Sequence, residues 1–363
     1  MIDLYTLSFE EISDLIQSWG EPRFRAKQLW GWLYDQRVAT FDAMRNLPAT
    51  LKQRLREETI LGTLELSAEQ QSGDGTVKRL YQLPDGQYIE SVLMEYDDDR
   101  RTACISTQAG CAMGCVFCAT GQMGFARHLT ATEIFEQAVY FARDLEARGE
   151  RLSNIVLMGM GEPFHNYDAS LDAIRRLMRD LGIGARHITV STVGLVPKIR
   201  QFADEGLQVK LAVSLHAATD EERSALLPVN KRYPLNELID ACHEYVTKSG
   251  RRMTFEWTLI QGENDTVEQA ETLGRLLHGL RCHVNVIPLN PTTGFDGDPS
   301  AMERIKTFID TLQHYGIPAT MRVRRGIDID AGCGQLKSNI LRKMKRAIQA
   351  SQITVESDDR IDS

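Results

Sequence analysis

Short apolar runs alternate with longer stretches of helical periodicity through most of the chain after residue 100. The runs have the length of buried strands, and in most of the intervening segments apolar residues recur every three or four positions. Such alternation predicts an α/β protein whose parallel strands are joined by crossover helices, and six or seven units predict an open or partial barrel. The predicted strands are 103–107, 154–158, 187–191, 209–214, 253–259, 283–288 and 319–323, and the predicted helices are 130–149, 168–181, 236–249, 265–279 and 300–315.

The first hundred residues follow a different pattern. Ser8 and Glu11 form a capping box before an apolar-periodic stretch, and a second amphipathic helix is predicted over 24–35. The turn signal Pro84-Asp85-Gly86 separates two short runs and predicts a β-hairpin. We therefore expect a small helical N-terminal domain (1–62), a β-hairpin linker (63–98), a partial barrel of the (β/α)6 type (99–349) and a loose C-terminal tail (350–363).

Composition narrows the class of protein. A hydrophobic content of 42% is ordinary for a soluble globular protein, and no stretch reaches the roughly 18 apolar residues of a membrane span. The N-terminus is acidic where a signal peptide would be basic, so we expect a cytoplasmic protein. The net charge of −8 disfavours a protein that coats nucleic acid nonspecifically. Residues 21–56 and 319–350 nevertheless contain eight Lys or Arg each, against three and two acids, and are either solvated faces or nucleic-acid contacts.

Three cysteines carry the strongest chemical signal. Cys111, Cys115 and Cys118 form a C-x3-C-x2-C run just after the first predicted barrel strand. Three thiolates on one tight loop suit an iron–sulfur cluster with one iron left open to a small molecule, whereas a closed zinc or ferredoxin site wants four ligands. The alternative is that Cys104 is a fourth ligand in a structural zinc or iron–sulfur site.

Small or polar motifs follow the other predicted strands. Because the chemistry of barrels gathers at the carboxyl ends of the strands, these motifs are expected to surround one pocket. Glycine lets the backbone approach a ligand, and Glu162 can accept hydrogen bonds from an ammonium or a ribose. The motifs are Gly159-Met-Gly161-Glu162-Pro163, Ser191-Thr192-Val-Gly194, Ser214-Leu215-His216 and Asn290-Pro291.

Two further cysteines are placed to reach the same cavity. Strand alternation puts Cys104, Ser106 and Gln108 on one side of the first barrel strand, facing the interior. Cys333 lies in a glycine-rich loop after the last strand. Either could also be a buried structural cysteine. Cys242 and Cys282 have no such placement, and we assign both to packing.

Together these motifs closely resemble the RlmN/Cfr family of radical S-adenosylmethionine (SAM) RNA methyltransferases, over nearly the whole chain. The matching segments are Ile89-Glu90-Ser91-Val92, Cys104 seven residues before the cysteine run, Met158-Gly-Met-Gly-Glu-Pro163, Ser214-Leu-His216, Pro288-Leu-Asn-Pro291 and Asp328-Ile-Asp-Ala-Gly-Cys333-Gly-Gln-Leu336. One departure is visible: Ala331-Gly332 stands where Ala-Ala is more usual, which should only loosen that loop.

The resemblance implies a radical SAM barrel and a set of ligands. One [4Fe-4S] cluster would be held by Cys111, Cys115 and Cys118, and two molecules of SAM would be used per turnover. The implied SAM contacts are Gly161, Glu162, Ser191, Ser214, Leu215, His216 and Asn290. A flavodoxin or ferredoxin is the implied electron donor, and the expected state is a monomer.

The resemblance also implies the reaction. Cys333 would take a methyl group from one SAM, radical chemistry on that methyl would add it to an adenine carbon, Glu90 would accept the ring proton, and Cys104 would release the product by forming a transient disulfide with Cys333. Pro163 favours the RlmN type, which methylates C2 of an adenine in the peptidyl-transferase centre of 23S rRNA and of the adenine beside the anticodon in tRNA.

Three alternatives stay open at this point. A Cfr-like enzyme would methylate C8 of adenine. Another radical SAM enzyme, acting on a small molecule or a protein, would share the three-cysteine run but would have no use for Cys104 and Cys333. A non-enzymatic iron–sulfur or zinc module would not react with SAM at all.

Overall fold

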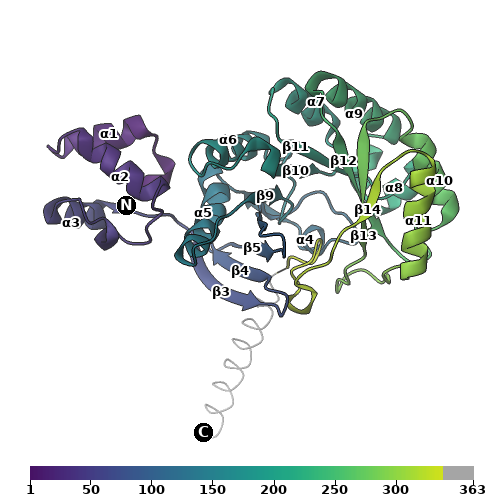
Figure 1. The fold of residues 1–363 in the computed structure, drawn as a ribbon, viewed down its shortest axis with the longest axis horizontal. Coiled ribbons are helices and arrows are strands. Elements are labelled where there is room, and N and C mark those ends of the chain that lie inside the picture. The colour runs from purple at the N-terminus through teal and green to yellow at the C-terminus, as the bar shows by residue number, and fades with distance from the viewer. Residues whose placement is uncertain (338–363) are drawn as a thin grey trace, which may run out of the picture.

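The computed structural model describes residues 1–337, and a single ten-stranded sheet organises it (Figure 1). The strand order is β14-β13-β12-β11-β10-β9-β6-β5-β4-β3. The neighbours from β6 to β14 pair in parallel, whereas β3, β4, β5 and β6 pair antiparallel. The parallel strands are β6 (Arg101–Cys104), β9 (Asn154–Leu157), β10 (Ile188–Thr192), β11 (Lys210–Ser214), β12 (Met253–Leu259), β13 (Cys282–Pro288) and β14 (Ala319–Met321).

Helices cover the outer face of the parallel strands, as the alternation along the chain predicts (Figure 1). Their apolar faces are buried against the sheet, and in α5 the capping box of Thr130 and Glu133 starts the helix. The helices are α5 (Ala131–Ala147), α6 (Tyr167–Arg179), α7 (Val196–Asp204), α8 (Asp220–Leu226), α9 (Leu235–Ser249), α10 (Val267–Leu276) and α11 (Met302–His314). The predicted α/β partial barrel is confirmed, and α7 and α8 are additions that the sequence pattern did not indicate.

The N-terminal residues form three helices beside α5 and α6 (Figure 1). They are α1 (Phe9–Ser18), α2 (Phe24–Tyr34) and the unpredicted α3 (Ala49–Glu58), with β1 (Ile2–Asp3) and β2 (Thr59–Ile60) pairing at their base. The predicted capping box of Ser8 and Glu11 is present. The ring centre of Trp30 lies 5.5 Å from that of Phe9 and 4.3 Å from that of Tyr34, so this partly buried tryptophan packs against the core.

The predicted hairpin is confirmed as β4 (Val77–Gln82) and β5 (Tyr88–Glu95), and it carries an unpredicted edge strand, β3 (Glu65–Gln71). Because β5 pairs with β6, this antiparallel unit is an extension of the barrel sheet and brings residue 90 toward the barrel. The predicted tail, 350–363, and residues 338–350 of the C-terminal basic segment, with four of its eight basic side chains, lie outside the described residues. Within residues 1–337, no helix combines the length and apolar character needed to cross a membrane.

Candidate active site

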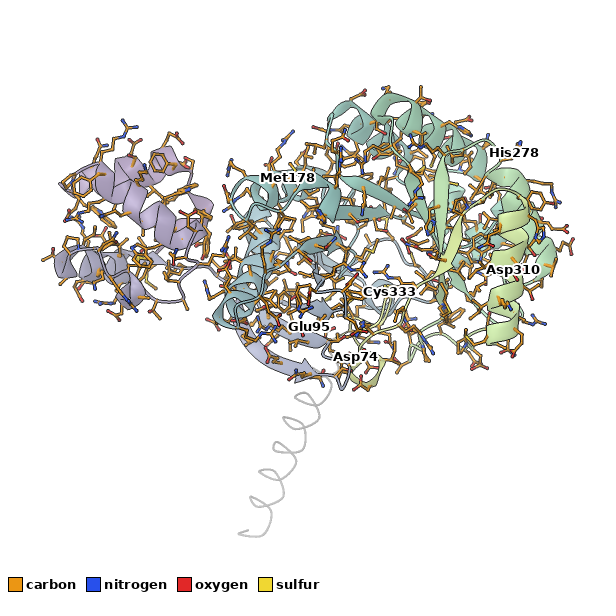
Figure 2. The ribbon with its side chains drawn as sticks, in the orientation of Figure 1. Asp74, Glu95, Met178, His278, Asp310 and Cys333 are labelled. Carbon is orange, nitrogen blue, oxygen red and sulfur yellow. The ribbon has the colours of Figure 1, made fainter. Side chains whose placement is uncertain are left out.

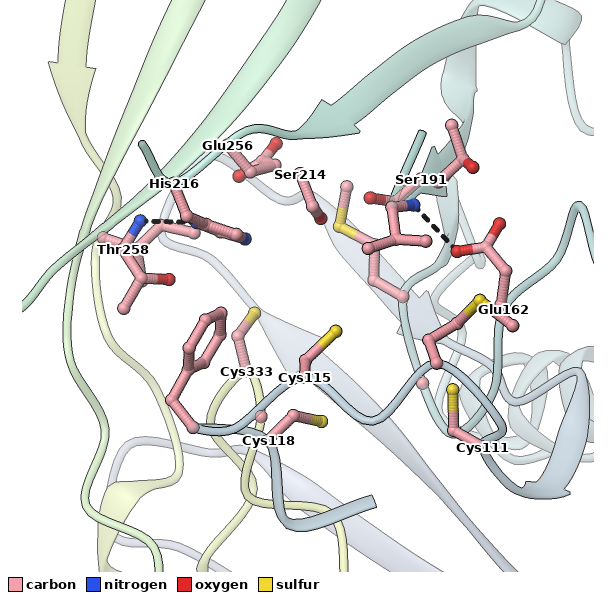
Figure 3. A pocket seen from close by; sticks show the side chains of 18 of the residues that line it. Cys111, Cys115, Cys118, Glu162, Ser191, Ser214, His216, Glu256, Thr258 and Cys333 are labelled. Atoms are coloured by element: carbon pink, nitrogen blue, oxygen red, sulfur yellow. Dashed lines mark hydrogen bonds between the residues drawn. The ribbon is translucent and has the colours of Figure 1, made fainter. Parts of the chain in front are cut away.

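The three-cysteine loop lies at the carboxyl end of the barrel, between β7 (Gln108–Gly110) and β8 (Phe125–His128). These strands pair antiparallel, the Cys111 amide donates to the Gly124 carbonyl over 2.9 Å, and the short helix α4 (Ala119–Gln122) closes the loop. The side chains of Cys111, Cys115 and Cys118 all line one pocket and point into it (Figure 3). All three thiols therefore come from one short segment of the chain.

The environment of these thiols suits a cluster. Burial raises the pKa of the Cys111 thiol to about 12 and also raises those of Cys115 and Cys118, so thiolates are stable here only beside bound cationic metal. In the described part of the chain, no three cysteine, histidine or acidic side chains are close enough together to hold a single metal ion. A [4Fe-4S] cluster fits this arrangement because it places each thiolate on a different iron.

The predicted SAM contacts gather around the same pocket, with one exception. Gly161, Glu162, Ser191, Ser214, His216 and Asn290 line it together with the three cysteines. Leu215 does not line the pocket, and its side chain is fully buried. Figure 3 shows Glu162 and Ser191 on one side of the pocket and His216 on the other. The strands therefore deliver these side chains to one edge, as the barrel geometry predicts.

Glu162 is already engaged by the backbone. Its carboxylate accepts hydrogen bonds from the Val193 amide at 2.8 Å and the Phe164 amide at 2.9 Å. Burial raises its pKa to about 7, against the opposing effect of these two donors. A carboxylate has further acceptor sites beyond these two, so Glu162 can also accept from a ligand ammonium, which would favour its ionised form.

The two glycines before Glu162 are required by close packing. A Cβ at Gly159 would lie 2.7 Å from the Ile105 carbonyl, and one at Gly161 would lie 2.5 Å from the Gln108 side chain. Gly161 also has a φ of +102°, which other residues rarely adopt. These glycines therefore bring the loop after β9 against the chain that leads to the cysteine loop.

His216 is held in a fixed orientation and is neutral. Its Nδ1 accepts from the Thr258 amide over 2.9 Å, and its backbone carbonyl accepts from the Asn264 side chain. Burial lowers its pKa to about 3. The remaining ring nitrogen, Nε2, then carries the proton and is the one that can donate to a ligand.

The Cys333 loop is tied directly to the cysteine loop. The Ala119 amide donates to the Gly334 carbonyl at 2.7 Å, the Thr120 hydroxyl donates to the Leu336 carbonyl, and the Asn290 side chain donates to the Cys333 carbonyl at 3.0 Å. Figure 2 shows Cys333 near the centre of the molecule, between the parallel and the antiparallel strands. The side chain of Cys333 is thereby brought into the pocket of the three cysteines (Figure 3).

A second cavity adjoins the first, and Cys333 lines both. Cys104 lines only this second cavity, so it is separated from the cysteine loop and is not placed as a fourth cluster ligand. All seven cysteines lie within residues 1–337 and carry free thiols, so the predicted disulfide is not formed in this structure. Burial raises the pKa of the Cys104 thiol to about 12.

Glu90 lies on β5 beside the second cavity. Alternation places it on the face of Val92 and Met94, which line that cavity, although Glu90 itself does not. Its side chain is 1% exposed, one carboxylate oxygen has no hydrogen-bond partner, and the Lys78 ammonium lies 3.7 Å from the other. Burial raises the pKa of Glu90 to about 7, and Lys78 opposes that rise.

Comparison with known proteins agrees with this geometry. Residues 105–274 match the radical SAM superfamily, and residues 2–61 match the ribosomal RNA large subunit methyltransferase N-terminal domain. The chain is 54% identical to dual-specificity RNA methyltransferase RlmN 1 of Myxococcus xanthus, over 96% of this chain and 98% of the relative. It is 48% identical to a probable RlmN of Halalkalibacterium halodurans, over 92% and 93%. The chain belongs to the RlmN family.

A solved structure of this type has the same fold. A radical SAM methyltransferase from Sphaerobacter thermophilus superposes with a TM-score of 0.89 at 51% identity, covering 93% of this chain and 99% of that one. As a member of the RlmN family, the chain is a radical SAM enzyme that uses a [4Fe-4S] cluster and SAM.

One part of the site prediction was wrong. Strand β6 ends at Cys104, so Ser106 and Gln108 do not continue its inward face. The Ser106 hydroxyl donates to the Glu90 carbonyl, and the Gln108 side chain accepts from the Glu162 amide at 2.8 Å. Both residues support the RlmN-family pocket from behind and do not line it.

Sequence reasoning also missed two residues of the RlmN-family pocket, Glu256 and Arg322. Their charged groups lie 3.7 Å apart, and Glu256 also accepts from Asn285 over 2.9 Å. The Cys333 sulfur is the largest cause of a raised pKa for Arg322, which indicates that the guanidinium faces it. The available signal was a single acid at an inward position of β12, in a strand whose neighbours are apolar.

Proposed function

We propose that this protein methylates C2 of an adenine in the peptidyl-transferase centre of 23S rRNA and of the adenine beside the anticodon in tRNA. The observation that carries the proposal is that Cys333 lines both the pocket of the three cluster cysteines and the cavity of Cys104. A radical SAM enzyme without a methyl-carrying cysteine has no need of this arrangement. Relatives about half identical to this chain are named dual-specificity RNA methyltransferases.

An adenine ring carbon is a poor nucleophile, so polar methyl transfer from SAM is not available there. Cys111, Cys115 and Cys118 would hold the [4Fe-4S] cluster, which would supply the electron for radical chemistry on SAM. The Cys333 thiolate first takes a methyl group from SAM by displacement, releasing S-adenosylhomocysteine, and then presents that methyl to the base. Glu162, Ser191, Ser214, His216 and Asn290 line the pocket and would hold SAM there, whereas Leu215 is buried outside the pocket lining.

Release of the product needs two more side chains. The methyl group on Cys333 would lose one hydrogen atom to the 5′-deoxyadenosyl radical obtained from a second SAM, and the methylene left on the sulfur would bond to the ring carbon. Glu90 then accepts the proton that leaves the ring carbon, with the unpartnered oxygen of its carboxylate as the acceptor, and the odd electron of the adduct would return to the cluster. The Cys104 thiolate attacks the Cys333 sulfur, the carbon–sulfur bond breaks, the released carbon takes up a proton to become the methyl group, and the two cysteines form a transient disulfide. Cellular thiols then reduce that disulfide and restore both free cysteines.

The remaining assignments concern partners. We propose that the N-terminal domain, residues 1–62, contacts RNA through basic side chains such as Arg23 and Lys27, and that residues 63–98 join it to the barrel by extending the barrel sheet. The predicted end of the barrel, residue 349, lies outside the described residues. A looped, unstacked adenine suits entry into a barrel mouth better than one inside a duplex. A flavodoxin or ferredoxin supplies the electron, and the enzyme acts as a monomer in the cytoplasm.

Mass spectrometry of cellular RNA tests the proposal. Total 23S rRNA and tRNA from a strain lacking the gene should contain no 2-methyladenosine at the target positions, and complementation with this chain should restore it. Complementation with an empty vector is the control. If the restored nucleoside is 8-methyladenosine, the enzyme is of the Cfr type; if no RNA nucleoside changes, the substrate is not RNA.

The pH dependence of methylation should report on Glu90. A base must be ionised to accept a proton, and the pKa of Glu90 is raised to about 7, so the rate should fall as pH drops below about 7. Replacing Lys78 by methionine removes the cation at 3.7 Å and should shift this acid limb upward by about one pH unit. The measurement is the single-turnover methylation rate from pH 5.5 to 9.

Lys78→Arg is the matched control, because it keeps the positive charge and should leave the acid limb near its original position. Glu90→Gln should remove the acid limb together with most of the activity. An acid limb that is unmoved in Lys78→Met would show that a group other than Glu90 accepts the proton.

A further inference from the structure

A further cavity opens at the opposite end of the barrel from the cysteine loop and reaches inward to Met158, Glu256 and Arg322, which also line the active-site pocket. Its rim comes from the loops that precede the strands, so it lies at their amino ends, whereas the catalytic residues lie at their carboxyl ends. In most barrels the interior is filled by branched apolar side chains. Here the inward positions of β9 to β14 near this end are polar, among them Asn154, Thr189, Thr254, His283 and Thr320.

The lining of this lower cavity is positively charged, whereas the whole chain is negatively charged. The chain has 50 acidic and 42 basic residues, yet seven arginine or lysine side chains and one carboxylate, that of Glu256, line the cavity. Six of the cations come from five separate loops or strand starts, and the seventh is Arg322 on the inner wall. The six are Arg100, Arg186, Lys210, Arg251, Arg252 and Arg281.

Most of these cations have no counter-charge. Arg100 lies 3.6 Å from Asp98 and Arg322 lies 3.7 Å from Glu256, but the other five make no ion pair with any residue of 1–337. Elsewhere on the surface the arginines are commonly paired, as Arg200 is with Glu244. Like charges held together destabilise the fold, so a cluster of this kind is expected to be neutralised by something that binds.

Two further observations indicate that the cations lie within electrostatic reach of one another and are only partly satisfied, since Arg251 donates to the Gln208 side chain and Arg281 to the Gly250 carbonyl. The pKa of Lys210 is lowered first by burial and then by Arg251, Arg100 and Arg252, which places those three guanidinium groups within electrostatic reach of its ammonium. Arg251 Nε and His283 Nδ1 are buried and have no hydrogen-bond partner in the described part of the chain. Buried polar atoms without partners are uncommon and point to a missing ligand or water.

We propose that this lower cavity binds a small phosphorylated anion, of the class of pyrophosphate or a nucleoside polyphosphate. A guanidinium group binds phosphate oxygens through two parallel hydrogen bonds. Several guanidinium groups around one cavity therefore suit a small anion that has several negative charges. The neutral hydroxyl, amide and imidazole groups of the wall lie below the cationic rim and suit the polar remainder of such a molecule. The proposal rests on the six cations at the amino ends of the strands and not on the proposed RNA methylation.

Titration of the full-length protein with sodium pyrophosphate tests the proposal. Isothermal calorimetry at constant ionic strength, with sodium chloride as the ionic control, should show one saturable site. Arg252→Glu should weaken this binding by about tenfold or more, since it removes charge-assisted hydrogen bonds and adds repulsion. Lys210→Met is a milder second variant that removes one cation without reversing its charge, and it should weaken binding in the same direction.

The matched control is Lys306→Glu, which makes the same charge reversal at an exposed position of α11 away from the cavity and should leave the affinity within about twofold. Absence of saturable pyrophosphate binding, or equal weakening by Arg252→Glu and Lys306→Glu, would overturn the proposal. A single-stranded RNA oligonucleotide supplies the other source of phosphate. If it binds through Arg252 and Lys210 while pyrophosphate does not bind, the cavity is an RNA contact and the small-anion proposal is wrong.

Discussion

Replacing Cys333 by alanine is expected to abolish RNA methylation while SAM is still cleaved reductively to 5′-deoxyadenosine. The substitution removes only the sulfur and keeps the Cys333 backbone carbonyl that accepts from Asn290, so the cluster cysteines and the residues around SAM should be undisturbed. Without that sulfur there is no carrier for the methyl group, and the loss should reach at least roughly a thousandfold, as for other covalent nucleophiles. Methylated adenine and 5′-deoxyadenosine are both measured by mass spectrometry in an anaerobic assay with purified RNA.

Cys282→Ala provides the control. Cys282 is buried on β13 and lines neither cavity, so its variant should keep both activities near those of the original protein. Methylation that survives in Cys333→Ala would show that the methyl group passes directly from SAM to RNA. Loss of SAM cleavage together with methylation would instead indicate that the Cys333 loop is needed to form the SAM pocket, since Gly334 and Leu336 are bonded to the cysteine loop.

The barrel could be predicted from the sequence because its elements are long and periodic. Strand β12 is an almost continuously buried run, and helix α9 has buried residues at helical spacing, so both were placed to within a residue. The elements that the sequence did not predict are short, or they form only by pairing with another segment of the chain. Helix α3 is polar and begins at Pro48 without a side-chain cap, and β7 and β8 exist only because they pair around the cysteine loop.

The site divides in the same way. Residues that belong to short sequence motifs, such as Cys111 to Cys118 and Gly161-Glu162, could be assigned to one pocket. This was possible because the carboxyl ends of parallel barrel strands lie at the same edge. Arg322 could not, since only the folded sheet shows that β14 turns this arginine toward Glu256 and Cys333. Strand alternation placed Cys104 correctly at an inward position. The same alternation was wrongly continued to Ser106 and Gln108, because the strand ends at Cys104 and the Gln108 side chain then bonds to the Glu162 amide.

Replacing Cys104 by alanine is expected to trap the enzyme on its RNA. Cys104 and Cys333 line the same cavity, and Cys104 is the only other cysteine among those lining it, so no second thiol in the described residues is placed to break the carbon–sulfur bond of the adduct. The covalent RNA–protein species should therefore accumulate to a large fraction of the enzyme after one turnover, while release of methylated RNA falls at least roughly a hundredfold. Denaturing gel electrophoresis with radiolabelled RNA detects the adduct, and nuclease digestion followed by mass spectrometry should place it on Cys333.

Two variants make this outcome specific. Cys242→Ala removes a fully buried thiol that lines neither cavity, and it should form no adduct. The double variant Cys104→Ala with Cys333→Ala should also form none, because the sulfur that joins protein to RNA is absent. Normal product release from Cys104→Ala, with no adduct, would mean that the bond to Cys333 is broken by another group.

In the intact enzyme the Cys104 thiol has a pKa raised to about 12 by burial, so it resists ionisation until the adduct or RNA changes its surroundings. The release of methylated RNA should consequently accelerate with rising pH. The rate at which Cys333 is methylated should not show this same rise with pH.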